Sequence, residues 1–441
     1  MLSLTALSTL ITMVMAVDPP CPDNRYPSCT VVPLTTPDAY ATQRVPPPPA
    51  VPKWTAFVAS LTDTTAYPWQ DLAPMPGPDD GGAEPGKANA KGAAWGSLQN
   101  EATEVYACPK GQWALTFDDG PVYTDRTLAT LKANKANGTF FLIGADVVNN
   151  QTHSQFVQDI FNAGHQIALH SWTHRQISLQ PTDQVISELF LNILSIYKII
   201  GKVPRYYRPA YSAIDDRVRF ILKAMGLRPV IWNIESNDAG IGSAAPAGIE
   251  ITGTLTVDNV IQHVKNDFAQ KYDGRWNYFP GNNATDGSGK ATYDGFISLE
   301  HDITEDDVAV AQQVVPFVVG TGYQTVYVNQ CDQIMPNASF YLDDSSALVQ
   351  FIKTINLPLT DADFAPFTGS FPPIPAGGAS VTGAVSTASS SPGGNATATG
   401  GSASVVTTAA AATATTSAKS AAEGASSILS AVVGALVALF L

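Results

Sequence analysis

Two histidines and a pair of adjacent carboxylates have the types and spacing to hold a metal ion. His170 and His174 are four residues apart, so on a helical turn they share one face and can bind one divalent ion through imidazole nitrogens. Of the adjacent Asp118 and Asp119, one carboxylate could complete a site of two histidines and one carboxylate while the other acts as a base. Three protein ligands leave positions open for water and substrate, so this residue set predicts hydrolytic metal chemistry.

Arg208, Asp238 and His301 are further polar residues that come within a few positions of the end of a short apolar run. In a β/α barrel the carboxyl ends of the strands converge on one face, and that face contains the active site. Any one of these residues alone is compatible with a helix N-cap or an ordinary polar loop. Polar clusters after five different runs instead indicate one shared catalytic face.

The region from Cys108 to about Leu348 contains the elements that must position these residues. Short apolar runs alternate with longer helical patterns, which predicts parallel βαβ units. We expect strands at 113–117, 139–143, 166–169, 206–207, 229–232, 296–299 and 325–328, and helices at 125–132, 154–163, 183–200, 215–225, 257–269 and 306–318. Seven such strands predict an α/β fold, a distorted and nearly closed (β/α) barrel. Residues 240–254 and 274–290 contain Gly, Pro or Asn and are expected to form surface loops.

The N-terminal end of the chain predicts export. Residues 1–16 are apolar or hydroxylic and end in small residues, which is typical of a cleaved signal peptide; a buried N-terminal helix is the alternative. Residues 17–107 are rich in proline, so we expect an extended lead-in with little structure of its own.

The C-terminal end predicts attachment to the cell surface. Residues 349–427 form a linker that from Ala376 onward consists mostly of Ser, Thr, Ala and Gly, a composition typical of a disordered, O-glycosylated stalk. Residues 428–441 are apolar, but the run is shorter than the roughly 20 residues of a transmembrane span. This pattern predicts a GPI-attachment signal, with a short tail anchor or a docked helix as the alternatives. We therefore expect a secreted protein at the cell wall and the outer face of the plasma membrane.

The charge balance limits the class of partner. Asp and Glu total 38 against 24 Lys and Arg, which gives a net charge of −14. An acidic chain lacks the electrostatic footprint of a nucleic-acid-binding protein, so we exclude that partner class. Anionic polymers would be repelled, whereas a neutral polysaccharide is compatible with this charge.

Four cysteines and five sequons also fit a secreted chain. An even number of cysteines favours disulfides, four cysteines allow three pairings, and the spacing matches no zinc-binding CxxC pattern. Cys21 and Cys29 are close enough to close a local loop, whereas Cys108 and Cys331 bracket the motif-rich region, so their pairing would tie its two ends together. N-glycosylation sequons begin at Asn137, Asn150, Asn283, Asn337 and Asn395.

Taken together, the polar clusters resemble the motifs of the NodB-type polysaccharide deacetylases, carbohydrate esterase family 4. The matching segments are Thr116–Gly120, His170–His174, Arg208–Tyr211, Trp232–Asp238 and Leu299–Asp302. The resemblance covers about residues 108–331 and implies a NodB homology domain, which we place at 108–348. Within the family the chain is similar to the fungal chitin deacetylases, which often have a Ser/Thr-rich tail and a GPI signal.

The resemblance implies a metal centre with a carboxylate base beside it. Asp119, His170 and His174 would bind zinc, or alternatively cobalt. Asp118 would be the general base that takes a proton from the attacking water, and Arg208 would orient it. A cation and an arginine beside Asp118 favour its ionised form, which a base requires.

The resemblance also implies an acid and an oxyanion site. His301 would be the general acid that protonates the leaving amine, and Asp238 would orient it and tune its charge. The metal and the backbone N–H of Tyr211 would stabilise the oxyanion, a contribution on the order of 10²–10³ in rate for one donor. The implied reaction is hydrolysis of the N-acetyl groups of chitin or chito-oligosaccharide to chitosan and acetate.

Two positions depart from the family pattern and keep other functions open. In the fourth motif Glu235 stands where an Asp is usual, and Ala239 stands where a Trp is usual; the third motif has Ala210 after Arg208-Pro209. A glycan-binding cell-wall protein of the same fold with little turnover is one alternative. Deacetylation of another polysaccharide, such as peptidoglycan or acetylated xylan, and a purely structural wall glycoprotein are the others.

Overall fold

The computed structural model describes residues 50–61, 104–246, 249–270, 294–336 and 338–356, together with residues 359, 362, 366, 368, 369 and 371. The expected signal peptide, the apolar tail and the Cys21–Cys29 pair lie outside these residues, as do most of the proline-rich region and of the linker. The expected loop at 274–290 and the sequons at Asn283, Asn337 and Asn395 also lie outside them. In the described ranges, no helix has both the length and the apolar character needed to cross a membrane.

Parallel strands form one sheet in the described part of the chain. Its order is β5-β4-β3-β2-β1-β7-β6, and β8 pairs beside the start of β1. The strands are β1 Gln112–Asp118, β2 Gly138–Leu142, β3 Gln166–Leu169, β4 Tyr206–Tyr207, β5 Arg228–Pro229, β6 Ile234–Glu235, β7 Phe296–His301 and β8 Gln324–Thr325. The sheet is a half-barrel with β5 and β6 at its ends, which confirms the predicted α/β barrel class.

A short segment after β5 takes the chain from one end of the sheet to the other. Val230 N donates a hydrogen bond to Tyr207 O on β4, and Asn233 N donates to Ile297 O on β7. The Asn233 side chain adds two hydrogen bonds to backbone groups at the start of β7. The sequence predicts one strand at 229–232; because the hydrogen-bonding partner changes within this stretch, the chain instead forms the two short strands β5 and β6.

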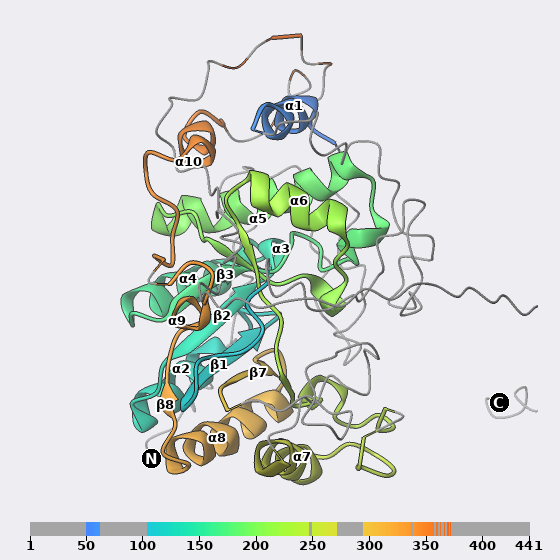
Figure 1. Cartoon of the computed structure of the whole chain (residues 1–441), viewed down its shortest axis with the longest axis vertical. Helices are drawn as coiled ribbons and strands as arrows, with labels where there is room; N and C mark the ends of the chain where they lie inside the picture. The colour runs from blue at the N-terminus through green and yellow to red at the C-terminus, as the bar shows by residue number, and fades with distance from the viewer. Residues whose placement is uncertain are drawn as a thin grey trace, which may run out of the picture. The chain divides into compact units, whose positions relative to one another are not determined.

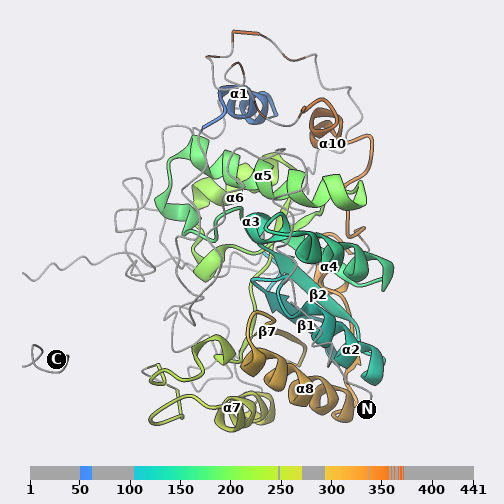
Figure 2. The same cartoon turned by 180° about the vertical axis from the view of Figure 1, so that it is seen from behind.

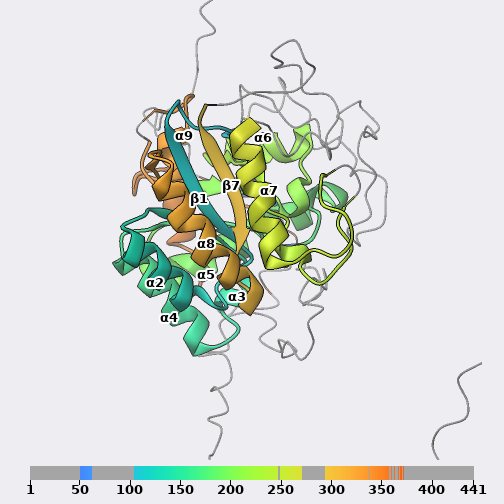
Figure 3. The ribbon, with the colours of Figure 1, turned by 90° about the horizontal axis from the view of Figure 1, so that it is seen from below.

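Helices cover the sheet on its outer side (Figures 1 and 2). They are α2 Thr124–Asn134, α3 Gly144–Val147, α4 Gln151–Asn162, α5 Thr182–Ile200, α6 Asp216–Ala224, α7 Val257–Gln270 and α8 Glu305–Gly320. The short helix α9, Val328–Cys331, follows β8 and contacts β1. Each predicted helix is present, with its ends shifted by a few residues. The last predicted strand, 325–328, is shorter than expected because α9 begins at Val328. Figure 3 shows β1 and β7 side by side beneath α8, on which α2 and α7 also pack.

Local capping explains where several helices begin and end. The side chain of Asn150 accepts a hydrogen bond from His153 N at the start of α4. Thr304 and Asp307 form a reciprocal capping box at the start of α8, and Gly201 ends α5 in the left-handed conformation. Caps of this kind satisfy backbone groups that helix ends otherwise leave unpaired.

Side chains on β1 alternate between two apolar layers. Trp113, Leu115 and Phe117 belong to the large core cluster, whereas Ala114 belongs to a smaller cluster with residues of β2, β3 and β7. Because successive side chains of a strand point to opposite faces, Thr116 and Asp118 share the face of Ala114. The alternation therefore places the polar end of β1 on the inner face of the half-barrel.

A helix within the proline-rich region packs on the domain. α1, Pro52–Ser60, lies where the sequence predicts no regular element. Trp54 stacks on Phe190 of α5 with ring centroids 5.0 Å apart, and Phe57 stacks on Phe351 at 3.9 Å. Phe351 belongs to α10, Ala347–Ile352, which itself extends past the expected domain end at residue 348. A nine-residue helix is marginal alone, so these tertiary contacts account for α1.

The predicted pairing of Cys108 with Cys331 is present as a disulfide. Both cysteines are buried, and the bond joins the segment before β1 to α9. It closes a loop of 223 residues, which in the chain-entropy model stabilises the fold by about 5 kcal/mol.

Candidate active site

The predicted site residues meet at the carboxyl ends of the strands. Asp118 ends β1 and His301 ends β7, and the two are paired in the ladder between these strands. His170 follows directly after β3, and Arg208 follows directly after β4. Asp238 begins the short 3-10 helix η4, Asp238–Gly240, which follows β6. One edge of the half-barrel thus presents two carboxylates, two imidazoles and a guanidinium.

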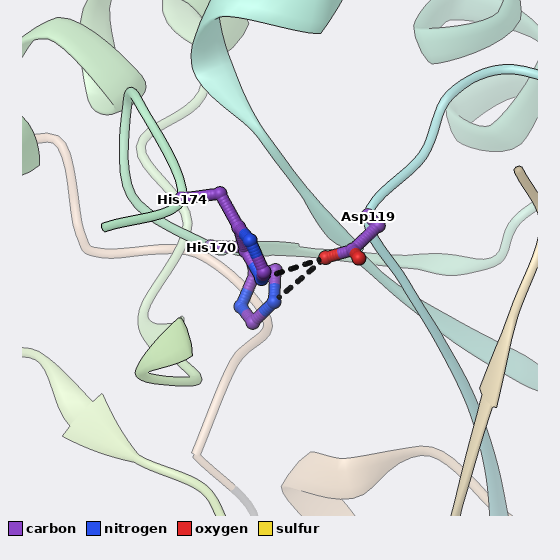
Figure 4. A group of neighbouring side chains, drawn as sticks. All are labelled: Asp119, His170 and His174. Atoms are coloured by element: carbon purple, nitrogen blue, oxygen red, sulfur yellow. Dashed lines mark ion pairs between the residues drawn. The ribbon is translucent and has the colours of Figure 1, made fainter. Parts of the chain in front are cut away.

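Asp119, His170 and His174 face one another at this edge (Figure 4). Oδ1 of Asp119 lies 3.1 Å from Nε2 of His170 and 3.0 Å from Nε2 of His174. One ligand atom from each residue lies within 4.8 Å of the other two. Burial raises the pKa of Asp119, but His174, His170 and His301 outweigh burial and lower that pKa well below its usual value.

A non-helical turn holds the two histidines, in place of the helical turn that their spacing predicts. Ser171 and His174 have left-handed φ values of 67° and 59°. The buried carboxylate of Glu188, on α5, accepts hydrogen bonds from Trp172 N at 2.8 Å and Thr173 N at 2.9 Å, and the Thr173 hydroxyl also donates to it. The sequence analysis missed Glu188. Its one signal is a charged residue on the apolar face of a helix.

The hydrogen bonding of His170 determines which ring nitrogen faces Asp119. Nδ1 lies 2.7 Å from the carbonyl oxygen of Arg208, which accepts and cannot donate, so Nδ1 has the proton. Nε2 is then the nitrogen that faces a carboxylate oxygen of Asp119, 3.1 Å away. Burial lowers the pKa of His170, but Asp118 and Asp119 outweigh burial and raise it, so this contact favours a positive charge, which a proton on Nε2 or a bound cation supplies. Imidazole and carboxylate donors suit zinc and related divalent ions, so the three residues fit a metal ion.

Arg208 holds Asp118 beside this cluster. Its Nη1 donates to Asp118 Oδ1 at 2.7 Å and to Thr116 Oγ1 at 2.8 Å. The guanidinium is fully buried and contacts two aromatic rings, with Cζ 4.1 Å from the Phe141 centroid and 5.4 Å from that of Trp232. Cation–π contacts stabilise a desolvated guanidinium, and removing one partner of a buried ion pair leaves an uncompensated charge. Asp118 is therefore fixed in position.

His301 is paired with Asp238 on the other side of the metal cluster. Asp238 Oδ1 lies 2.7 Å from His301 Nδ1, and Asp238 Oδ2 accepts from the backbone N of His301 at 2.8 Å. Burial lowers the pKa of His301, but Asp238, together with Asp119 and Asp118, raises it well above the usual value. Nε2 of His301 lies 4.0 Å from Asp119 Oδ2. This imidazole can hold a proton that faces the cluster.

Buried carboxyl groups surround the His301 pair. Burial, and then the charge of Asp238, raise the pKa of Glu300 to about 8. Burial likewise raises the pKa values of Asp302, Asp307 and Glu235 to about 7. An acid within a motif gives no signal of its protonation state, so the sequence analysis did not identify this group.

Tyr211 lies next to His174. It belongs to the 3-10 segment η3, Ala210–Ser212, and has a left-handed φ of 56°. Its ring centroid lies 4.7 Å from that of His174. The expected backbone donor is therefore part of the same edge.

A second group of side chains is also of types that bind metals, but none of its members belongs to the sequence motifs. It consists of Glu250, His263 and Asp267. Nδ1 of His263 lies 2.8 Å from Glu250 Oε1, so this contact joins the segment before α7 to that helix. The three residues lie on and before α7, outside the strand ends that contain the motifs.

Comparisons with known proteins give consistent matches. Residues 106–230 match the family model described as polysaccharide deacetylase. Chitin deacetylase 1 of Cryptococcus neoformans var. grubii is 30% identical over 243 residues, which cover 52% of this chain and 46% of that protein. The chitin deacetylase of Amylomyces rouxii is 29% identical over 233 residues, 52% of this chain and 48% of that protein. The chain thus spans about half the length of these relatives.

A solved structure also aligns with the chain. The chitin deacetylase from the fungal pathogen Colletotrichum lindemuthianum is 21% identical, with a TM-score of 0.43, over 55% of this chain and 96% of that one.

Proposed function

We propose that this chain, whose residues 106–230 belong to the polysaccharide deacetylase family, is a chitin deacetylase that releases acetate from N-acetylglucosamine units. The supporting observation is one grouping of side chains. A cluster that fits a metal has two groups close to it: a carboxylate held by an arginine, and an imidazole held by a carboxylate. The substrate follows from the names of the relatives.

The metal-binding role falls to Asp119, His170 and His174. We assign zinc to this site, with cobalt as the alternative. When bound, such an ion supplies Lewis acidity, which polarises the amide carbonyl and brings the pKa of water toward about 7.

Asp118 is the general base in this proposal. Its hydrogen bond with Arg208 at 2.7 Å fixes one carboxylate oxygen. Asp118 neighbours Asp119 in the chain, so the base and the metal ligand share one strand end. Asp118 accepts the proton of the water that attacks the acetamide carbonyl.

His301 is the general acid. Asp238 orients its ring and favours the protonated form, so Nε2 holds a proton for the departing amine. The backbone N–H of Tyr211, beside His174, donates to the oxyanion that forms at the carbonyl oxygen. Acid and base lie on adjacent strands, Asp118 opposite His301, and act on the same scissile bond.

We also propose that the protein acts outside the cell, anchored through GPI at the cell wall. This rests on residues 1–16 and 428–441 and on the Ser/Thr-rich composition from Ala376 onward. Removing residues 428–441 should release the protein into the medium. Continued cell attachment would contradict the anchor.

Acetate release from chito-oligosaccharides by the purified full chain tests the proposed reaction. We expect release that a chelator abolishes and zinc or cobalt restores. The full chain is required because α1 packs on α5. Asp118→Asn keeps all three ligands, so it should retain metal and lose at least about 100-fold in rate. Asp306→Asn, an exposed acid on α8, is the matched control and should keep full activity.

The outcomes separate the alternatives. Acetate release from acetylated xylan or peptidoglycan, but not from chito-oligosaccharide, would replace chitin as the proposed substrate. A metal-loaded protein that binds chito-oligosaccharide without releasing acetate would be the non-catalytic glycan-binding form. A folded protein that neither binds metal nor releases acetate would refute the proposed activity and favour the purely structural wall glycoprotein.

A further inference from the structure

Two of the five sequons lie in described residues, and their surroundings differ. Asn137-Gly138-Thr139 leads into β2, whereas Asn150-Gln151-Thr152 begins α4. The sequence marks both as acceptors and places Asn137 directly before an expected buried strand, where access is poor. The structure separates them because N-glycosylation needs a free side-chain amide nitrogen and room beside it.

The side-chain amide nitrogen of Asn137 is engaged in the fold. Its Nδ2 donates to the carbonyl oxygen of Thr325, on β8, at 2.9 Å, and its backbone N donates to the Thr325 hydroxyl at 3.2 Å. The third residue of the sequon, Thr139, is fully buried in β2 and hydrogen-bonds Gln166 and the backbone N of Val328. A sugar on Nδ2 of Asn137 would replace one of the two amide hydrogens and place its bulk directly beside the backbone of β8.

In Asn150 the side-chain oxygen, and not the nitrogen, makes the hydrogen bond to the fold. Its Oδ1 accepts the hydrogen bond of His153 N at 2.8 Å as the N-cap of α4, and among the described residues its Nδ2 donates none. Asn150 is half-buried, and Gln151 and Thr152 are exposed. In a planar amide, an oxygen directed at the helix end leaves the nitrogen pointing away from it. A glycan on Nδ2 therefore leaves the cap intact.

The segment around Asn150 is also held firmly. The ring of His153 hydrogen-bonds the carbonyl oxygen of Asp146 at 2.9 Å, and the Ser154 hydroxyl donates to Val147 O at 2.9 Å. The acceptor amide thus has a fixed orientation at the amino end of α4.

We propose that Asn150 is an N-linked glycan attachment site of the folded protein and that Asn137 stays unmodified. This inference rests on the proposed passage through the secretory route. The donor is an oligosaccharide linked through pyrophosphate to a polyisoprenoid lipid. A bond forms between Nδ2 and the sugar C1, the bond between C1 and the phosphate oxygen breaks, and one amide proton leaves with the lipid pyrophosphate.

Glycopeptide mapping by mass spectrometry tests the proposal on the full chain secreted from a eukaryotic host. A host secretion leader replaces residues 1–16, so entry into the secretory route does not depend on the native leader. The folded, monodisperse fraction is digested and analysed before and after enzymatic glycan release. We expect glycan on Asn150 and unmodified Asn137. Glycan on Asn137 in the folded fraction, or an unmodified Asn150, would overturn the inference.

Two variants provide the matched controls. Asn150→Asp keeps a carboxylate oxygen for the cap of α4 and removes the acceptor, so the protein should lose the mass of one glycan and remain folded. Asn137→Gln should leave the glycan mass unchanged. An unchanged mass for Asn150→Asp would refute the site independently of any effect on folding. Failure of the native leader alone to direct secretion would refute the route and leave the site assignment standing.

Discussion

Replacing Glu300 by Gln tests whether a neutral carboxyl group is built into the core beside the catalytic face. Glu300 is fully buried on β7, and its Oε2 accepts a hydrogen bond from the Ser298 hydroxyl at 3.2 Å. Burial and the charge of Asp238 raise its pKa from 4.5 to about 8, against the opposing effects of Ser298, Thr116 and Arg208. The folded protein therefore holds a proton there that the unfolded chain releases above pH 4.5.

The sign and size of the effect follow from that difference. Between the two pKa values the folded state binds one proton more than the unfolded state, so the free energy of unfolding falls as pH rises. One proton corresponds to about 1.4 kcal/mol per pH unit, which amounts to on the order of 4 kcal/mol between pH 5 and pH 8. Below pH 4.5 Glu300 is protonated in both states, so it causes no loss in the free energy of unfolding. Above pH 8 it is ionised in both states, so the loss is complete and no longer changes with pH.

Glu300→Gln removes this dependence while keeping an acceptor oxygen for Ser298. Urea unfolding at pH 5, 6, 7 and 8, with zinc present throughout, should show a slope shallower by about 1.4 kcal/mol per pH unit than that of the wild type. Ser298→Ala is the control. It removes the hydroxyl that also accepts from Trp113 Nε1, so it should lower stability. Because that hydroxyl also lowers the pKa of Glu300, its loss should leave a slope at least as steep as that of the wild type. Equal slopes for Glu300→Gln and the wild type would refute the buried neutral carboxyl.

Three further substitutions test other contacts. His170→Ala should lose metal and activity together, measured by metal analysis and acetate release; an active, metal-loaded variant would contradict the ligand assignment. Trp232→Leu removes one of the two cation–π contacts of Arg208, about 0.5–2 kcal/mol, and should lower kcat several-fold with KM unchanged; equal kcat would show that the ring does not position Arg208. Phe57→Ala should lower the free energy of unfolding by about 3–5 kcal/mol because it removes the stack on Phe351, and a loss below about 1 kcal/mol would contradict the docking of α1.

The sequence was most informative about features of the structure that depend on residues close together in the chain. Helical periodicity predicted α5 and α8 because their apolar faces repeat within a single element. The polar ends of β1 and β7 predicted the site because carboxyl ends of parallel strands share an edge. Both inferences depend on patterns within a few residues.

The features that the sequence missed depend on distant partners. β6 forms because the chain pairs with β4 at Val230 and with β7 from Asn233 onward. No local sequence pattern indicates this change of partner strand. The turn with His170 and His174 is shaped by Glu188, which lies on the next helix. α1 was readable in principle, since Trp54, Phe57 and Val58 follow a helical spacing after a proline.

The pairing of β1 with β7 has a consequence for synthesis of the chain. Trp113 pairs with Phe296, 183 residues later, so the central ladder cannot form until β7 has left the ribosome. At 5–20 residues per second this delay is roughly 10–40 s, during which one edge of β1 has no strand to pair with. Exposed strand edges favour association with other chains. A nascent chain therefore exposes this edge over the interval, and truncations before residue 296 should be recovered as aggregates.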